Sequence, residues 1–170
     1  MNCTEVYKLQ QDVTDARKRL DNCLKKGGDC SEFEQEVSDA EDKLRPHEPK
    51  LVICDLLIGT WAFNGNGYTG TLTIEASDVQ DNGSASFSGH AVIDIPHRDT
   101  LDGSYDVNTG VLRFTRTGDD NNARFQPQQY YGHIFANPRG NAKTTFGGVF
   151  AEGAPPLNSS SPWGWFMVRQ

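Results

Sequence analysis

The hydrophobic residues of the first 45 positions recur at intervals of three and four, the spacing of a narrow apolar stripe along a helix. Two such stripes follow one another, with a pair of glycines between them. The first stripe consists of Val6, Leu9, Val13, Ala16, Leu20 and Cys23, and the second of Cys30, Phe33, Val37, Ala40 and Leu44. Folded back on each other about the glycines, the two stripes lie in register. The pattern therefore predicts an antiparallel helical hairpin.

The residues around each stripe predict where the helices begin and end. The Gly-Gly pair at 27–28 favours the C-terminus of the first helix. Ser31, with Glu34 three residues later, has the pattern of a capping box for the second helix. Pro46 and Pro49 should end that helix, because proline lacks the backbone N–H that a helix interior needs.

The four cysteines fit this hairpin in one way. Four cysteines allow three pairings. The hairpin places Cys23 opposite Cys30 and brings Cys3, at its open end, toward Cys54, so we predict disulfides Cys3–Cys54 and Cys23–Cys30. The alternative is four reduced thiols that only fill the stripes. Paired structural cysteines indicate an oxidising compartment, so we expect a secreted or periplasmic protein whose signal peptide has been removed.

From residue 51 onward the helical period gives way to short runs separated by turn residues such as Asn, Asp, Gly and Pro. Eight strands are expected, near 57–63, 69–76, 84–95, 100–105, 111–117, 128–136, 144–152 and 163–169. Short turns between consecutive strands predict an up-and-down antiparallel order, and eight strands can close into a barrel without exposed edges. The chain is thus expected to be α+β, with a disulfide-linked helical hairpin at 1–50 and an eight-stranded β-barrel at 51–170.

Apolar and polar residues alternate within the strands, as a sheet with one buried face requires. The apolar set of the second strand is Leu72, Ile74 and Ala76, and that of the third is Ala85, Phe87, Ala91, Ile93 and Ile95. An apolar interior would hold either a packed core or a hydrophobic pocket. An apolar outer face would instead need to be covered by the hairpin or by another copy of the chain, which would make the protein a homo-oligomer.

The Gly-Thr-Trp run at 59–61 and the basic Arg169 near the chain's end resemble the calycin arrangement of lipocalin and avidin-type barrels. The resemblance covers about residues 56–170 and implies that Trp61 packs beneath Arg169 to close one mouth of the barrel. The same run, followed by Asn64 and a glycine turn, also resembles the opening of avidin-type proteins. The chain departs from lipocalins in placing its helices before the strands. The aromatic residues with which avidins grip biotin are not found at matching places, so biotin binding is not implied.

Composition and motifs narrow the function further. A formal net charge of −7 and a pI near 5.0 disfavour nucleic acid and anionic membrane surfaces, which are bound mainly through Lys and Arg. No apolar run approaches the roughly 20 residues that span a bilayer.

No motif for a nucleophile, a phosphate loop or a cofactor is found. His90 and Asp94 would lie roughly 13 Å apart along one strand, and His97 lies in a turn, so no metal site is expected; His133 is expected to be a hydrogen-bonded barrel histidine.

The strand order assigns the connections alternately to the two ends of the barrel. If the chain's start and Arg169 close one end, then the turns near 64–67, 96–99, 118–122 and 153–162 surround the open end. Three residues of this end, Tyr68, His97 and Trp163, are therefore the predicted ligand-binding residues. The aromatic residues of the strands either line a pocket or, alternatively, fill the core.

We expect, on these grounds, a secreted non-enzymatic binding protein whose barrel takes up a small molecule at its open end. One alternative is a protein-interaction or inhibitor module that uses the helical hairpin or the barrel loops. Another is a cofactor-free barrel enzyme, a cyclase or isomerase, in which an enclosed cavity and one or two polar groups suffice. An enclosed cavity would separate the first and third functions from the second.

Overall fold

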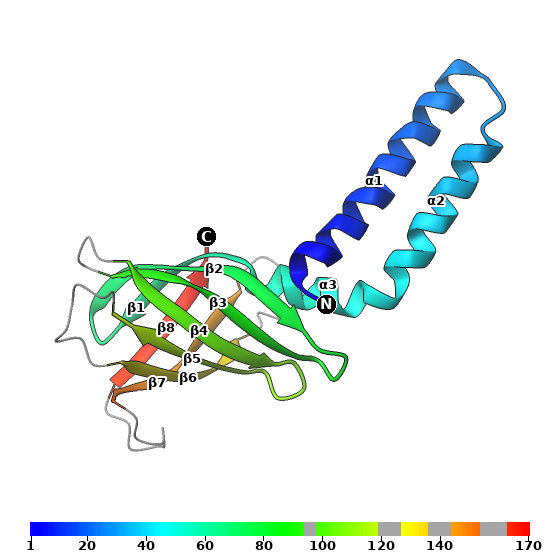
Figure 1. Ribbon diagram of the computed structural model, residues 1–170. Coiled ribbons are helices and arrows are strands. Elements are labelled where there is room, and N and C mark those ends of the chain that lie inside the picture. The colour runs from blue at the N-terminus through cyan, green and yellow to red at the C-terminus, as the bar shows by residue number, and fades with distance from the viewer. Residues whose placement is uncertain (94–97, 119–126, 136–143, 154–162) are drawn as a thin grey trace.

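A computed structural model of the chain describes residues 1–93, 98–118, 127–135, 144–153 and 163–170. Helices α1 (Cys3–Lys26) and α2 (Ser31–Leu44) form a hairpin that extends away from the barrel, and a short 3-10 turn, η1 (Arg45–His47), leads into helix α3 (Glu48–Leu57) at the barrel's end (Figure 1). Within these ranges no helix is both long and apolar enough to cross a membrane.

The hairpin forms largely as its pattern predicts. Asn2 caps α1, because its side chain accepts a hydrogen bond from the Glu5 backbone while the Glu5 carboxylate accepts one from the Asn2 backbone. The helix ends at Gly27, whose φ of 70° suits glycine. The predicted capping box of the second helix is wrong: Ser31 is already the first helical residue, and its N–H donates to the Asp29 side chain instead.

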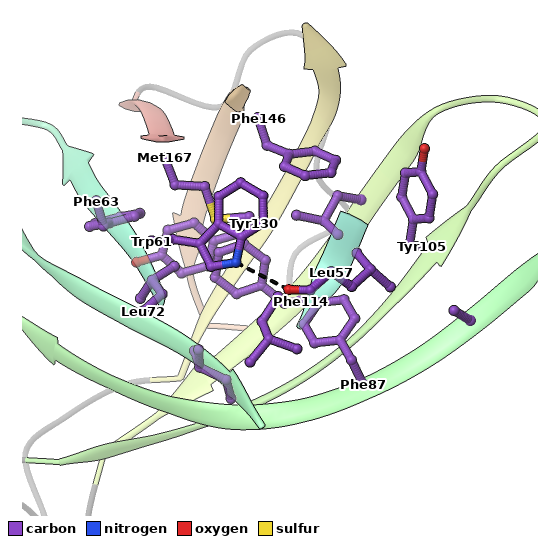
Figure 2. Close-up of a cluster of buried hydrophobic side chains, with 14 of the residues drawn as sticks. Leu57, Trp61, Phe63, Leu72, Phe87, Tyr105, Phe114, Tyr130, Phe146 and Met167 are labelled. Atoms are coloured by element: carbon purple, nitrogen blue, oxygen red, sulfur yellow. Dashed lines mark hydrogen bonds between the residues drawn. The ribbon is translucent and has the colours of Figure 1, made fainter. Parts of the chain in front are cut away.

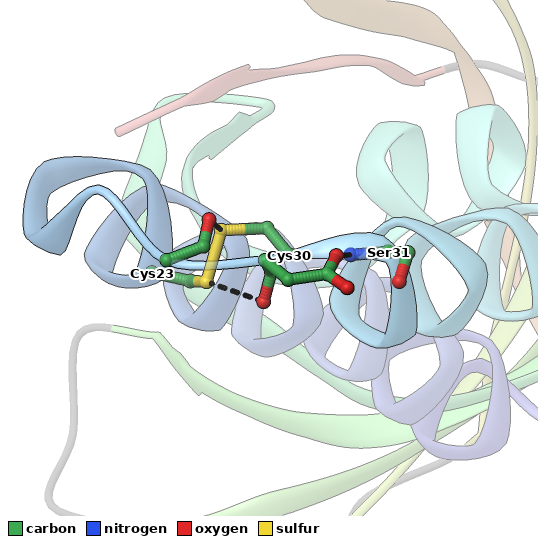
Figure 3. The surroundings of a disulfide bond; sticks show 5 residues. Cys23, Cys30 and Ser31 are labelled. Atoms are coloured by element: carbon green, nitrogen blue, oxygen red, sulfur yellow. Dashed lines mark hydrogen bonds between the residues drawn. A yellow bond between two sulfur atoms is a disulfide. The ribbon is translucent and has the colours of Figure 1, made fainter.

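Both predicted disulfides are confirmed. Cys23–Cys30 links the helices at the free end of the hairpin (Figure 3), and Cys3–Cys54 links the start of α1 to α3 at the end near the barrel. No cysteine is left unpaired in the described chain, which contains all four. Two disulfides indicate folding in an oxidising compartment.

Helix α3 corrects the expectation that helical structure ends before residue 51 and that a strand begins near Leu57. Pro49 lies in the first turn of α3, where a missing N–H breaks no hydrogen bond, so it begins a helix instead of ending one. The apolar residues that follow, Ile53, Cys54 and Leu57, are buried and join the barrel's core. Residue 50, the expected boundary between hairpin and barrel, thus lies inside α3.

Eight strands follow, each antiparallel to its neighbours, and the last pairs with the first to close the barrel. Their bounds are β1 (Gly59–Gly65), β2 (Tyr68–Val79), β3 (Ser84–Ile93), β4 (Asp99–Asp106), β5 (Val111–Thr117), β6 (Gln128–Phe135), β7 (Thr145–Glu152) and β8 (Trp163–Arg169). The predicted fold, a helical hairpin followed by a closed meander of eight strands, is confirmed.

Among the described residues, the apolar sets of the second and third strands face the interior except at Ala76, and Ile95 lies outside the described residues. Leu72 and Ile74 are buried as expected, but a bulge after Ile74 shifts the register of β2 against β3. Ala76 is therefore exposed, and Ser77 and Val79 are buried in its place.

Side chains fill the described part of the barrel interior (Figure 2). The gap between six inward-facing residues, which include Leu72, Phe114 and Met167, is too small for a water molecule. An eight-stranded barrel is just wide enough for side chains to occupy its whole interior. Of the two interiors considered from the sequence, the packed core is found, and most of the strand aromatics, including Tyr130, Phe146 and Trp165, contribute to it.

Trp61 and Arg169 close the end of the barrel next to α3. The Trp61 ring is completely buried, its indole N–H donates to the Leu57 carbonyl (Figure 2), and the Arg169 guanidinium lies 5.9 Å from the ring centre. That guanidinium also donates to the Asp55 and Ile58 carbonyls at the end of α3. One arginine therefore ties the last strand to the tryptophan of the first strand and to the helix before it.

We expect Trp61→Ala to lower the free energy of unfolding by about 3–5 kcal/mol, because a large, fully buried side chain leaves a cavity. Urea denaturation measures the change. Phe166→Ala is the matched control, since Phe166 lies on the outer wall with 49% of its surface exposed and should lose less than about 1 kcal/mol. A loss below about 1 kcal/mol for Trp61→Ala would contradict the closing role of this residue.

Candidate functional site

The end of the barrel opposite α3 carries the candidate site. The antiparallel order brings the ends of β1, β3, β5 and β7 to this mouth together with the starts of β2, β4, β6 and β8. Arg169 and α3 occupy the other end. The mouth is therefore the end at which inward-facing side chains can meet solvent or a ligand.

A row of inward-facing residues, all aromatic except one glycine, crosses the strands of the barrel to this mouth. Its members are paired across neighbouring strands in the order Phe87, Gly103, Phe114, Tyr130, Phe150 and Trp163. Ring centres lie 4.3 Å apart for Phe114 and Tyr130, 5.0 Å for Tyr130 and Phe150, and 5.4 Å for Phe150 and Trp163. Gly103 makes room for the row, because a Cβ there would lie 2.4 Å from the Phe87 ring. The row ends at Trp163, which is partly exposed.

Above these rings, a buried ion pair faces inward. Asp99 begins β4 and has only 3% of its surface exposed, and its Oδ2 lies 2.5 Å from both Nε and Nη2 of Arg116 on β5. The Arg116 side chain is itself 12% exposed. Leu112 and Phe114, which precede Arg116 at alternate positions of β5, are apolar and buried, so Arg116 continues the inward face of the strand with a charge.

Gln128, on the next strand, connects this ion pair to the aromatic row. Its Oε1 accepts hydrogen bonds from Nη1 of Arg116 at 3.0 Å and from the Tyr130 hydroxyl at 2.7 Å. Its amide nitrogen donates to Glu152 on β7 at 3.4 Å. The five residues Asp99, Arg116, Gln128, Tyr130 and Glu152, here called the mouth cluster, thus form one connected set over strands β4 to β7.

Burial controls the chemistry of Tyr130. Desolvation raises the pKa of its hydroxyl to about 12, although the nearby Arg116 guanidinium acts in the opposite direction by favouring the phenolate. Tyr130 is therefore a neutral hydrogen-bond donor at physiological pH. The mouth cluster then holds one positive charge, on Arg116, and two carboxylates, those of Asp99 and Glu152.

Two of the three predicted ligand-binding residues lie among the described residues. Trp163 lies at the mouth and ends the aromatic row. Tyr68, the first residue of β2, lies at the same mouth with 59% of its surface exposed. His97 and Asp94 lie outside the described residues. Whether Tyr68, His97 and Trp163 bind a ligand stays a prediction.

The remaining histidine candidates lie on the outer wall. His90 contacts Glu75 at 2.9 Å, and exposed His133 is 3.3 Å from the Tyr131 hydroxyl, in keeping with a hydrogen-bonded barrel histidine. In the described ranges no group of three His, Cys, Asp or Glu residues could hold a metal ion.

Sequence reasoning missed the mouth cluster. The turn residues at 96–99 predict that Asp99 lies in a turn, and its partner Arg116 is 17 residues away in the chain. A signal was nevertheless present, because Arg116 and Gln128 each stand at a position that the alternation of their strand assigns to the apolar, inward face. A charge in such a position indicates either a misplaced register or a buried partner.

No protein-family model and no curated protein sequence matches the chain. Among solved structures, the chain is similar to a redesigned β-barrel, mFAP1, bound to DFHBI, with 16% sequence identity and a TM-score of 0.42. The match covers 68% of this chain and 97% of that barrel. At this identity the similarity concerns the barrel fold alone.

We expect Arg116→Met to destabilise the protein by about 3–5 kcal/mol, because it leaves the Asp99 carboxylate buried without its partner. The double change Asp99→Leu with Arg116→Met should recover most of that loss, since no unpaired charge remains. Arg113→Met is the control on the same strand: Arg113 faces outward over the Tyr131 ring, and its loss should stay near 0.5–1 kcal/mol. Urea denaturation that ranks the double variant below the single one would contradict the ion pair.

The raised pKa of Tyr130 predicts how stability responds to alkaline pH. The folded state holds the phenolic proton up to a pKa of about 12, whereas the unfolded chain releases it near 10. Stability is therefore fully present below pH 10 and falls as the pH rises toward 12. As the pH rises from about 9 to 11.5, we expect the free energy of unfolding of Tyr130→Phe to fall by about 2 kcal/mol less than that of the wild type. Denaturation of both proteins across this range measures the change. If the free energy of unfolding falls with pH by the same amount in both, the burial of the hydroxyl is contradicted.

Proposed function

We propose that the protein is a secreted, non-enzymatic binding protein that takes up a small molecule at the open end of its barrel. The observation that carries this proposal is the inward-facing ion pair of Asp99 and Arg116 at one end of an otherwise apolar interior. Small-molecule sites typically combine apolar and aromatic walls with a few polar groups in fixed positions. The mouth cluster and the end of the aromatic row supply both.

Stability alone gives little reason for charges at this place. Removing a carboxylate and a guanidinium from water costs several kcal/mol each, and an apolar pair of similar volume often stabilises a protein as well or better. Leu, Phe and Met occupy comparable inward positions elsewhere in this barrel. A charged pair at the mouth is therefore better explained by contact with something polar than by packing.

No enclosed cavity is found between the described residues of the filled core, so the proposal depends on the mouth and not on a cavity inside the barrel, and the core sets how deep a ligand can reach. Tyr130, which belongs to the mouth cluster, and Phe150, whose ring stacks on it, are both buried, and the interior leaves no room for even a water molecule between Leu72 and Phe114. A ligand is accordingly expected to rest on the mouth, against the cluster and the partly exposed Trp163, and not within the barrel. Tyr68, at the same rim, is the other aromatic residue within this proposal.

We expect a ligand-observed NMR screen of small ring-containing molecules against the oxidised protein to give hits. In spectra of the protein itself, these hits should shift the indole N–H resonance of Trp163. Those hits should lose at least about fivefold in affinity for the Tyr68→Ala, Trp163→Ala double variant, since aromatic contacts contribute about 1 kcal/mol each. Phe135→Ala with Phe166→Ala, which removes two exposed outer-wall rings, is the matched control and should bind like the wild type. Hits that keep their affinity for the mouth variant while it remains folded would place the binding site elsewhere.

A further inference from the structure

The charged side chains at the mouth differ in how fully they are paired with opposite charges. Arg116 contacts Asp99 through Nε and Nη2 and Gln128 through Nη1, so its positive charge is already matched. Glu152 is exposed, and among the described residues its carboxylate accepts one hydrogen bond, from the Gln128 amide at the long distance of 3.4 Å. Among its described residues the mouth therefore presents an unmatched negative charge at Glu152, and the net charge of −7 on the whole chain adds to the same field.

Glu152 lies next to the exposed end of the aromatic row. It follows Phe150 by two residues on β7, so both side chains point inward and their Cα atoms are about 7 Å apart. Phe150 is paired with Trp163 on β8, with the ring centres 5.4 Å apart. The carboxylate of Glu152 and the partly exposed indole of Trp163 thus stand on neighbouring strands at the rim.

We propose that this pair makes the mouth selective for a small organic cation that carries a flat ring. This inference rests on the proposed function and adds the ligand's charge to it. The ring would continue the aromatic row by stacking on Trp163, where offset or edge contacts between rings are favourable. The ammonium group would face the Glu152 carboxylate and the electron-rich face of the indole, both of which attract a cation.

The same groups disfavour other ligands of similar shape. An anion would approach Glu152 and Asp99, and the Arg116 guanidinium of the mouth cluster is already paired with Asp99, so within the mouth cluster it would meet repulsion without a free cationic partner. A neutral molecule would keep the stacking on Trp163 but would lack the charge attraction. The preference for a cation therefore depends on Glu152, and the contact area between the ligand ring and the protein depends on Trp163.

Three probes that share one phenyl ring test this inference: phenethylamine, 2-phenylethanol and phenylacetate. Their affinities are measured at neutral pH by titration of the ¹⁵N-labelled protein, with the Trp163 indole N–H and the backbone amides at the ends of β7 and β8 as reporters, the backbone amides alone serving for Trp163→Leu. We expect phenethylamine to bind most tightly. Glu152→Gln should weaken phenethylamine about fivefold, the size of an exposed charge contact, and leave 2-phenylethanol unchanged, whereas Trp163→Leu should weaken both.

Glu75→Gln is the matched control, because Glu75 lies on the outer wall and pairs with Arg98 while the substitution changes the net charge by the same amount. Equal binding of the three probes at the mouth, or no effect of Glu152→Gln on phenethylamine, would overturn the inference and leave the proposed function standing. If no probe shifts the Trp163 resonance while unrelated screening hits do, the cation selectivity is likewise overturned. If neither does, the proposed function fails with it.

Discussion

The contact between Trp61 and Arg169 determines how the rest of the structure is arranged. It joins the first strand to the last at the closed end of the barrel, and the same guanidinium binds carbonyl groups at the end of α3. Gly59 has a φ of 138°, a conformation that favours glycine, and a Cβ at this position would lie 3.4 Å from Arg169. The first strand, the last strand and the end of α3 therefore meet at one small group of atoms, in addition to the backbone pairing of β1 with β8.

The same closure fixes the helical hairpin to the barrel. Cys54 of α3 is bonded to Cys3 of α1, and both belong to the apolar core that includes Trp61. The other disulfide, Cys23–Cys30, holds the two helices together at the end farthest from that core (Figure 1). The hairpin is thus anchored at its base by packing and a covalent bond, and secured at its tip by a covalent bond. Its exposed surface is largely polar, with ion pairs between the helices such as Arg17–Glu41.

Much of this fold could be predicted because it follows from periodicity. The helical stripes fixed the hairpin register and with it both cysteine pairs, and turn residues separated the eight strands. Helix α3 was missed because its apolar run is short, and short apolar runs fit a buried strand as well as a helix. The bulge after Ile74 was missed because it depends on how β2 pairs with β3. Local pattern carries no information about such pairing.

The candidate site was predictable in its location and not in its chemistry. Strand order alone identified the open end and placed Trp163 there, but Asp99 and Arg116 meet only after β4 and β5 have paired. The packed core then changes the expected mode of binding, from a ligand inside the barrel to one resting on its mouth. Buried charges, aromatic stacking and the unmatched carboxylate of Glu152 become neighbours through that packing.

A crystal structure of the oxidised protein grown with phenethylamine would test this account most directly, because it locates the ligand relative to the core. The account predicts density for the ring against Trp163, with the ammonium group within hydrogen-bond distance of the Glu152 carboxylate and the side chains beneath unmoved. Density inside the barrel between Leu72, Phe114 and Met167 would contradict the filled core. Density on the outer wall or on the helical hairpin alone would contradict the assignment of the site to the mouth.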